Sequence, residues 1–475
     1  MKTSFIGGEW RQGSDIYRNI NPSDTTDVVD EFSQADQTLA ESAIDSAHEA
    51  FRSRKVLGIQ ARAEALDKVG NELLARRNEL GELLSREEGK TRPEGIGEVT
   101  RAGQIFKFFA GEVVRQRGEH LDSVRPGVTV DIAREAVGVV GIIAPWNFPI
   151  AIPAWKIAPA LAYGNCVVFK PAEGVPSSAW ALSEIIGRAG FGDGVFNLLI
   201  GRGSVVGKTM LESLKVDAIT FTGSTITGAR VMATAGARFA KLQLEMGGKN
   251  PLVITDDADL ETALNCTIQG SYYSTGQRCT ASSRIIVTEG IYSKFRDALI
   301  DRLGSLQVGH ALAPDTDIGP VVDANQLETD LKYVGIGKNE GATLAYGGEH
   351  LTRDTNGYFM APALLTDVDN TMRVAREEIF GPVACLIAAR DFDDALQKAN
   401  DSEFGLSAGI CTTSLKLASH FKREIQAGMV MVNVPTAGVD YHVPFGGRKA
   451  SSYGSREQGS YAAEFYTTVK TSYNG

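Results

Sequence analysis

The sequence has few cysteines and no grouping of them that would hold zinc or form a disulfide framework. Only five occur in 475 residues, and they are odd in number, widely spaced and without a CxxC motif. Scattered thiols of this kind are typical of a reducing compartment, so we expect a cytoplasmic protein without a metal centre. The cysteines are Cys166, Cys266, Cys279, Cys385 and Cys411.

The sequence also lacks an export signal and an uninterrupted membrane-spanning segment. The first ten residues contain no apolar core of about 7–15 residues, which a signal peptide requires. Residues 136–155 are 20 uncharged, mostly apolar positions, but Pro145, Pro149 and Pro153 would break a helix there. We therefore predict a buried strand in this stretch and no membrane partner.

No run of Lys or Arg is present, and the net charge of −10 with a pI near 5.3 argues against a nucleic-acid partner. The hydrophobic content of 43% and charged content of 22% are typical of a globular protein with a large core. A length of 475 residues predicts two or three domains.

From residue 137 onward, short apolar strands alternate with helical patterns. Strands at 139–144 and 166–170, with a helix at 177–189, are typical of parallel βαβ units covered on both faces. A second unit of this kind begins near residue 251. Before these units, residues 37–116 have the 3–4 spacing of two or three amphipathic helices.

One cysteine, Cys279, lies in a small polar turn between apolar runs. A thiol becomes a strong nucleophile as its thiolate, and the nearby Ser274, Gly276 and Thr280 leave room for backbone N–H groups and a substrate. The alternative is a buried, inert cysteine, because free cysteines are commonly core residues.

An acid lies 34 residues upstream of this cysteine. Glu245 stands near the end of a predicted strand over residues 241–246, just before two glycines, where side chains commonly project into clefts. A partly desolvated carboxylate there would deprotonate a thiol or a water molecule. The alternative is an ion pair with Lys241 or Lys249.

These two segments resemble the aldehyde dehydrogenase superfamily, whose marks are a Leu-Glu-(Leu/Met)-Gly-Gly-Lys stretch and a downstream Gly-Gln-x-Cys. The spacing between them also fits that family, and the resemblance extends over nearly the whole chain. Further motifs occur in the family's order at residues 145–149, 170–173, 221–224, 377–382 and 444–447.

The resemblance adds a domain organisation to the predicted α/β fold. We expect two Rossmann-like parallel-sheet domains and a small β element for oligomerisation. Residues 467–471 should pair with the hairpin at 120–135 of a partner chain, in a dimer or tetramer. The expected boundaries are 1–117 and 137–248 for the cofactor-binding domain, 249–448 for the catalytic domain, and 118–136 with 449–475 for the oligomerisation element.

The resemblance also implies a mechanism of NAD(P)-dependent aldehyde oxidation. Cys279 would attack the aldehyde carbon, and Asn147 with the Cys279 backbone N–H would hold the resulting oxyanion. Hydride then passes to a nicotinamide and leaves a thioester on the sulfur. Glu245 would activate the water that releases the carboxylate product.

The expected cofactor-binding residues follow from motif positions and from strand ends, where α/β sheets bind nucleotides. Ser224 stands between a strand and a helix, where backbone N–H groups meet a pyrophosphate, and a simple N-cap is compatible with that role. A carboxylate at Glu173 accepts hydrogen bonds from a ribose 2′-hydroxyl and repels a 2′-phosphate, so NAD is favoured over NADP. The set is Trp146, Lys170, Glu173, Gly223, Ser224, Glu378 and Phe380.

By family position, six residues line a substrate tunnel: Phe148, Trp155, Arg278, Thr280, Tyr441 and Phe445. Arg278 would suit an anionic aldehyde, and an ion pair with a nearby acid is the open alternative. Residues 437–447 and 455–459 look most like the branch that oxidises α-ketoglutaric semialdehyde (2,5-dioxopentanoate) to 2-oxoglutarate. Succinate semialdehyde or another small aldehyde stays an alternative.

Two other function classes are weaker. Residues 201–209 resemble a dinucleotide fingerprint and a P-loop but fit neither, because Val206 and Arg202 stand where those motifs need glycine. We expect a structural turn there. A cysteine hydrolase without redox chemistry would need a histidine, and the six histidines carry no recognisable partner motif.

Overall fold

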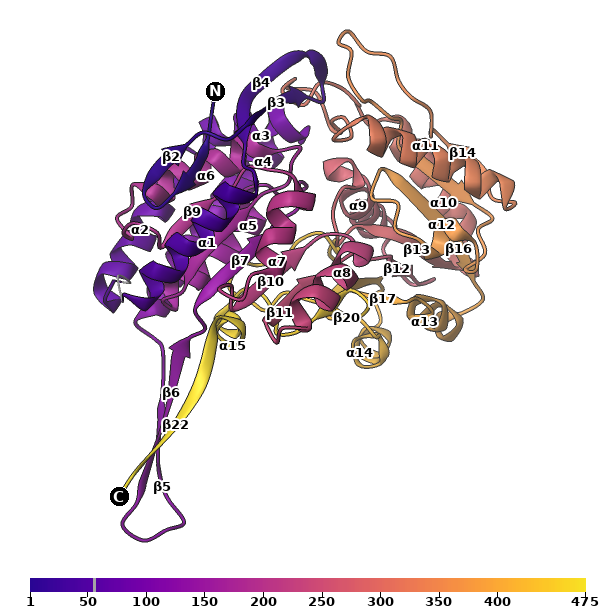
Figure 1. The fold of residues 1–475 in the computed structure, drawn as a ribbon. Coiled ribbons are helices and arrows are strands. Elements are labelled where there is room, and N and C mark those ends of the chain that lie inside the picture. The colour runs from indigo at the N-terminus through magenta and orange to yellow at the C-terminus, as the bar shows by residue number, and fades with distance from the viewer. Residues whose placement is uncertain (54–56) are drawn as a thin grey trace.

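The structure, a computed structural model, describes residues 1–53 and 57–475 and contains two large sheets of mainly parallel strands (Figure 1). The first sheet has the order β2-β1-β9-β8-β7-β10-β11-β21, and its five central strands, β9 to β11, run parallel. The strands are β1 (Ser4–Ile6), β2 (Glu9–Arg11), β7 (Val139–Ile143), β8 (Cys166–Lys170), β9 (Phe196–Leu198), β10 (Ala218–Thr222), β11 (Lys241–Glu245) and β21 (Ser452–Tyr453).

The order of the parallel strands shows where a ligand would bind. The chain forms β7 first, adds β8 and β9 on one side, and then adds β10 and β11 on the other. The strand order therefore reverses between β7 and β10, and sheets of this Rossmann type bind ligands at the carboxyl ends of the strands at such a point.

In the described part of the chain, four helices rather than two or three precede the first parallel strand: α1 (Gln37–Arg52), α2 (Ile59–Ala75), α3 (Arg77–Glu88) and α4 (Arg92–Val113). The boundary between α2 and α3 is a single residue, Arg76, whose guanidinium pairs with Glu72 and Glu79, so spacing alone hides it. Gly89 then ends α3 with a left-handed φ of 99°, and a capping box of Thr91 and Glu94 starts α4.

The crossover segments of the first sheet are α5 (Ala151–Ala162), α6 (Pro176–Gly187), the π-turn at Gly203–Gly207 with α7 (Lys208–Glu212), and α8 (Thr225–Gly236). The turn at 201–209 thus opens a helix, as expected. Residues 136–155 hold β7 and the start of α5. Within the described residues, no helix has both the length and the apolar character needed to span a bilayer.

The second sheet has the order β14-β15-β16-β13-β12-β18-β19, parallel except at β14. Its strands are β12 (Asn250–Ile254), β13 (Ser282–Thr288), β14 (Thr343–Tyr346), β15 (Ala363–Thr366), β16 (Val383–Ala389), β18 (Ser407–Cys411) and β19 (Met429–Val432). Its helices are α9 (Leu260–Ser271), α10 (Glu289–Gly304), α11 (Ala324–Asn339), α12 (Arg373–Arg376), α13 (Phe392–Asn400) and α14 (Leu415–Glu424). The two-sheet α/β fold is confirmed, while the exact domain boundaries stay a prediction.

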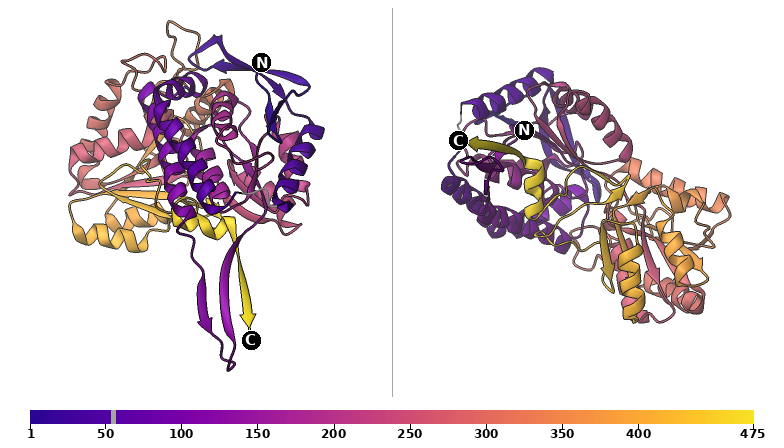
Figure 2. Two further views of the ribbon diagram at one scale, coloured as in Figure 1. Left: turned by 90° about the vertical axis from the view of Figure 1, so that its left-hand side faces the viewer. Right: turned by 90° about the horizontal axis from the view of Figure 1, so that it is seen from below.

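A long arm of three strands projects from the body and carries the C-terminus (Figures 1 and 2). It consists of β5 (Glu119–Asp122), β6 (Thr129–Ala136) and β22 (Thr467–Asn474), which follows α15 (Ala463–Tyr466). The predicted hairpin is present, but the prediction that the last strand pairs with a partner's hairpin is wrong. β22 pairs with β6 of its own chain over eight positions, from Thr467↔Ala136 to Asn474↔Thr129, because α15 delivers it beside β6.

The remaining strands form two small antiparallel pairs. β3 (Asp15–Asn21) and β4 (Asp24–Gln34) pair through the predicted turn at residues 21–24, and β17 (Phe404–Gly405) pairs with β20 (Arg448–Lys449). The segment after residue 448 also supplies β21 to the first sheet before it reaches the arm. Residues 309–323 contain no helix or strand, as expected.

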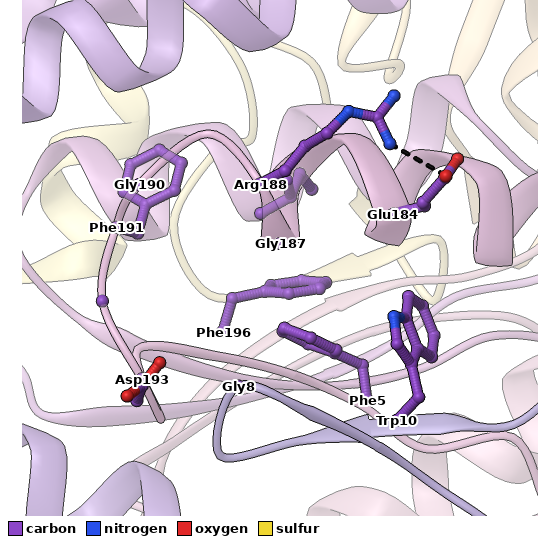
Figure 3. A pocket seen from close by; sticks show the side chains of 12 residues that line it. Phe5, Gly8, Trp10, Glu184, Gly187, Arg188, Gly190, Phe191, Asp193 and Phe196 are labelled. Atoms are coloured by element: carbon purple, nitrogen blue, oxygen red, sulfur yellow. Dashed lines mark ion pairs between the residues drawn. The ribbon is translucent and has the colours of Figure 1, made fainter.

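The N-terminal strands leave a surface hollow of about 460 Å³ against the end of α6 (Figure 3). Phe5, Trp10, Phe191 and Phe196 surround it, and an Arg188–Glu184 ion pair of 2.9 Å lies on the helix above. Phe5 and Trp10 pack with ring centroids 4.9 Å apart. These contacts attach the N-terminal segment to the edge of the first sheet.

We expect Asn165→Ala to destabilise the fold strongly, because this fully buried amide joins three segments. Its Oδ1 accepts from Gly138 N at 3.0 Å, and its Nδ2 donates to Ala160 O at 3.1 Å and to Tyr466 O at 2.9 Å. Losing these partners should cost about 2–4 kcal/mol of unfolding free energy. Urea unfolding measures the loss, and the exposed Asn71→Ala is the control. An equal effect of the two substitutions would contradict this role.

Candidate active site

A cavity of about 220 Å³ lies at the carboxyl ends of β7 and β10, where the strand order reverses. Segments that follow strands of the first sheet line one side, and segments of the second sheet line the other. Seven of the predicted site residues meet here: Trp146, Asn147, Gly223, Ser224, Cys279, Glu378 and Phe380. The rest of the lining is Pro145, Thr222, Met246, Gly247 and Gln326.

The turn that carries Cys279 has a strained backbone. Ser274 and Thr275 are consecutive non-glycine residues with φ of 51° and 56° in the left-handed region. Thr275 Oγ1 donates to Gly319 O at 3.1 Å, which holds part of this turn. Gly276 has φ of 66°, and a Cβ there would lie 2.2 Å from the Gly381 carbonyl oxygen, so only glycine fits.

Cys279 itself is held through its carbonyl group. Asn250 Nδ2 donates to Cys279 O at 2.7 Å and to Ala281 O at 2.9 Å. Gly248 lies against the same carbonyl, where a Cβ would approach it to 2.8 Å. Burial is the largest cause that raises the pKa of the Cys279 thiol to about 12, and the charges of nearby carboxylates, Glu378 first and then Glu245, contribute to the same shift.

Asn147 follows β7 and is 2% exposed. Its Nδ2 donates to the Gln277 carbonyl at 3.0 Å, so the amide is oriented along the turn that leads to Cys279. An amide nitrogen carries two hydrogens and is able to donate a second bond. Asn147 and Cys279 both line the same cavity, so the residue with this second donor and the residue with the thiol face a common space.

Glu245 is buried at the end of β11 but does not line the cavity. Ser452 Oγ donates to its Oε2 at 2.5 Å, and its charge still acts on the Cys279 thiol. Burial raises the pKa of Glu245 well above its ordinary value, and repulsion from the carboxylate of Glu457 adds to this. Glu457 is itself paired with the buried Lys156.

Lys170 and Glu173 lie together beyond the end of β8, with Gly203 beside them. Lys170 is 4% exposed, and its ammonium donates to the Pro171 carbonyl at 2.7 Å. Burial lowers the pKa of Lys170 to about 8. Glu173 is exposed and accepts from Gly203 N at 2.6 Å, so the predicted structural turn orients this carboxylate. These residues lie outside the lining of the cavity.

The other five predicted cofactor residues are arranged around the cavity. Ser224 is the N-cap of α8, where its Oγ accepts from Thr227 N at 3.3 Å, and Gly223 precedes it. Glu378 accepts from Gly248 N at 2.9 Å, and burial raises its pKa to about 7. Phe380 and Trp146 pack edge to face with centroids 5.4 Å apart.

The predicted substrate residues lie off the cavity lining, in a largely apolar layer. Trp155 and Phe445 are buried with ring centroids 5.4 Å apart, and Tyr441 packs edge-on against Phe108 of α4 at 6.2 Å. Phe148 lies under the Lys90 ammonium, which is 3.6 Å from the ring centroid. Thr280 is buried and its carbonyl accepts from Thr436 Oγ1 at 2.8 Å.

Arg278 forms an ion pair with an acid, as the alternative interpretation of this residue expects. Its Nη2 pairs with Glu94 Oε1 at 3.0 Å and donates to Ser274 Oγ at 2.7 Å, and its Nη1 donates to the Gln269 carbonyl. An engaged guanidinium recognises an anionic aldehyde poorly. The expectation that Arg278 receives a substrate anion is therefore not supported by its contacts.

A different arginine, Arg101 of α4, was missed. Its Nε and Nη2 atoms are shielded from solvent and have no hydrogen-bond partner in the described part of the chain. Burial lowers its pKa, and the charges of Asp440, Glu98 and Cys279 oppose that shift. One signal in the sequence pointed to Arg101. It stands seven residues before Phe108, which places a charged side chain on the apolar face of a predicted helix, where it would be buried.

Comparison with known proteins identifies the family. The sequence model of the aldehyde dehydrogenase family matches residues 10–472. This chain belongs to the aldehyde dehydrogenase family. It is thus an aldehyde dehydrogenase enzyme, and the motif resemblance noted in its sequence is confirmed.

Among curated relatives, this aldehyde dehydrogenase is 44% identical to the α-ketoglutaric semialdehyde dehydrogenase of Bacillus subtilis, covering 98% of this chain and 97% of that protein. It is 38% identical to the 2,5-dioxopentanoate dehydrogenase of Saccharolobus solfataricus, covering 99% and 98%. Among solved structures, betaine aldehyde dehydrogenase of Staphylococcus aureus in complex with NAD⁺ matches with a TM-score of 0.97 at 35% identity, covering 100% of this chain and 94% of that one.

We expect Glu378→Gln to make Cys279 more reactive in the ligand-free enzyme. Negative charge at Glu378 raises the thiol pKa, so removing it should lower that pKa and raise the thiolate fraction. Alkylation by iodoacetamide at pH 8.5 should accelerate about 3–10-fold. The neighbouring Glu377→Gln is the control, because Glu377 pairs with Arg373 and Tyr333 instead. Unchanged alkylation in Glu378→Gln would contradict this electrostatic coupling.

Proposed function

We propose that this aldehyde dehydrogenase oxidises an aldehyde through a thiohemiacetal and a thioester on Cys279. The observation that carries the proposal is the cavity at the strand reversal, where Cys279 and Asn147 meet the ends of β7, β10 and β11. The sulfur forms a bond to the aldehyde carbon, and the carbonyl oxygen becomes an oxyanion. Asn147 Nδ2 and the Cys279 backbone N–H are the donors for that oxygen.

The second half-reaction requires water. After hydride leaves the thiohemiacetal carbon, the thioester is hydrolysed when Glu245 takes a proton from a water molecule that attacks the acyl carbon. The C–S bond breaks, and the carboxylate product and the thiol are released. Since Glu245 hydrogen-bonds Ser452 and lies behind the lining, its carboxylate must turn toward Cys279 for this step. Its pKa, raised by burial and by the charge of Glu457, makes this carboxylate a stronger base than an exposed one.

We propose NAD as the hydride acceptor, because amino acid side chains do not accept hydride themselves. The residues present fit a dinucleotide. Lys170 and Glu173 offer an ammonium and a carboxylate for the adenosine ribose, and Gly223 and Ser224 precede the twelve-residue helix α8, whose N-terminus suits a pyrophosphate. The exposed Glu173 carboxylate favours a free 2′-hydroxyl over a 2′-phosphate. The NAD⁺ complex of the structural relative is consistent with this choice.

We further propose α-ketoglutaric semialdehyde as the substrate and 2-oxoglutarate as the product. Two relatives that share nearly the full length of the chain carry that activity in their names. A candidate anion receptor supports the proposal: Nε and Nη2 of Arg101 have no hydrogen-bond partner among the described residues, and together they could donate to both oxygens of a carboxylate. Succinate semialdehyde has the same terminal carboxylate and is the alternative substrate.

We propose that the arm of β5, β6 and β22 contacts another copy of the chain. Its outer strand β22 presents an unpaired edge, and Leu121, Val469 and Tyr473 expose apolar surface at 46%, 59% and 61%. Exposed edges and apolar side chains of this kind commonly mark association surfaces. A dimer or tetramer would cover them.

The proposed reaction is tested by NAD reduction at 340 nm with α-ketoglutaric semialdehyde, succinate semialdehyde and butanal, and with NADP in place of NAD. We expect the highest kcat/KM for the first aldehyde with NAD. Glu245→Gln should give one burst of NADH per active site and then a turnover reduced by about 10²-fold or more. Ester hydrolysis without any nicotinamide-dependent aldehyde oxidation would instead favour a cysteine hydrolase.

Arg101→Met tests the anion receptor. We expect kcat/KM for the two carboxylate-bearing aldehydes to fall about 10–100-fold, because a charge-assisted pair is lost, while kcat/KM for butanal stays unchanged. Arg92→Met on the same helix is the control, since Arg92 forms an exposed pair with Glu82. An equal loss for charged and neutral aldehydes would show that Arg101 does not recognise the carboxylate.

A further inference from the structure

Two carboxylates of α4, Glu94 and Glu98, lie one turn apart and each contacts a different half of the active site. Residues at i and i+4 project from the same face of a helix. Glu94 contacts the turn that carries Cys279, and Glu98 contacts the segment that follows Asn147. One face of α4 thus contacts both segments. The segment with Asn147 follows β7 of the first sheet, and the turn with Cys279 follows α9, which packs with the second sheet.

Glu94 divides its two carboxylate oxygens between two tasks. Oε2 accepts from Thr91 N and Oγ1 at 3.2 and 2.9 Å, which is the capping box of α4. Oε1 accepts from Ser274 N and Oγ, both at 2.8 Å, and pairs with Arg278 Nη2 at 3.0 Å. A helix cap needs only the first set of bonds. The second set restrains Ser274, one of the two strained residues before the nucleophile.

Glu98 anchors the other segment together with Lys90. Its Oε1 accepts from Ile150 N at 2.9 Å and Ala151 N at 3.1 Å, where α5 begins. Its Oε2 pairs with the Lys90 ammonium at 2.8 Å, and that ammonium also donates to the Asn147 carbonyl. The side chains of Lys90 and Glu98 are each 1% exposed, so the pair is held in a rigid, low-dielectric environment.

The segment between Asn147 and α5 is therefore fixed at both ends by one ion pair. The amide of Asn147 completes the connection, since its Nδ2 reaches the Gln277 carbonyl in the Cys279 turn. An oxyanion donor must lie within a few tenths of an ångström of its productive position, and a misplacement of about 1 Å costs roughly 10²-fold in rate. The position of this donor relative to the sulfur depends on contacts made by α4.

We propose that Glu94 and Glu98 are positioning residues. Together they fix the position of the Asn147 amide relative to the Cys279 thiol. This inference rests on the proposed roles of Asn147 as oxyanion donor and Cys279 as nucleophile. Glu98, through Lys90, orients the amide. Glu94 holds the turn that presents the sulfur.

Two reactions of Cys279 separate these roles. Hydride transfer from bound aldehyde, measured as the pre-steady-state NADH burst, passes through an oxyanion and needs the Asn147 amide. Alkylation by iodoacetamide is a displacement at carbon that forms no oxyanion and needs only the thiolate. A defect in the amide position alone slows the first reaction and spares the second.

We expect Glu98→Gln to slow the burst about 10–100-fold. Its alkylation rate, KM for NAD and thermal midpoint should stay close to those of the unchanged enzyme. Glu94→Gln should slow both reactions, because the turn bearing the sulfur is itself released. Glu112→Gln is the control for both, since it lies near the far end of α4 and pairs with Arg115. If Glu98→Gln slows alkylation as much as the burst, or changes neither, the proposal is overturned.

A double-mutant comparison gives the decisive result. If Glu98 acts through Asn147, adding Glu98→Gln to Asn147→Ala should cause no further loss of burst rate. Losses that multiply would overturn the positioning role while leaving the oxyanion role intact. A wild-type burst in Asn147→Ala alone would instead refute the proposed oxyanion donor.

Should Glu98→Gln fail to fold, because it leaves the Lys90 charge buried and unpaired, the pair Lys90→Met with Glu98→Gln removes both charges together. The same comparison then applies. Loss of the burst with retained alkylation supports the proposal, and retention of both rates overturns it.

Discussion

The candidate active site depends on the burial of acidic groups around one thiol. Burial raises the pKa values of Cys279, Glu245 and Glu378, and the charges of Glu378 and Glu245 add to the effect at Cys279. In the ligand-free enzyme the thiolate is thus disfavoured. A positive charge in the cavity would oppose this effect and favour the thiolate.

The crevice exists because the carboxyl ends of strands in the first sheet face the amino ends of strands in the second. Asn147, Gly223 and Glu245 lie at or just after the ends of β7, β10 and β11, whereas Cys279 and Glu378 lie in the loops that lead into β13 and β16. Neither sheet carries a complete site. Polar contacts from α4 and from Asn147 join the two halves. They hold a turn whose backbone is strained at Ser274 and Thr275.

The proposed reaction and the proposed recognition of the substrate use different residues. Cys279 and Asn147 line the cavity, while Tyr441 and Trp155 pack against Phe108 and Phe445 outside its lining. Arg101 of α4 is also outside the lining, and its Nε and Nη2 have no hydrogen-bond partner among the described residues. If these roles hold, a change of aldehyde specificity would need no change at the reacting atoms.

The sequence by itself determined the alternation of strands and helices and the family. It also singled out Cys279, Glu245 and Asn147 as candidates for the reaction, because turns rich in glycine and strand ends leave local patterns around them. The tertiary structure decided which charges are used. Arg278 is next to the nucleophile in the chain but is neutralised by Glu94, whereas Arg101, far away in sequence, lies near the thiol without a hydrogen-bond partner for its Nε or Nη2 among the described residues. Likewise β22 pairs within its own chain. Such pairings arise between segments distant in sequence, and no local pattern encodes them.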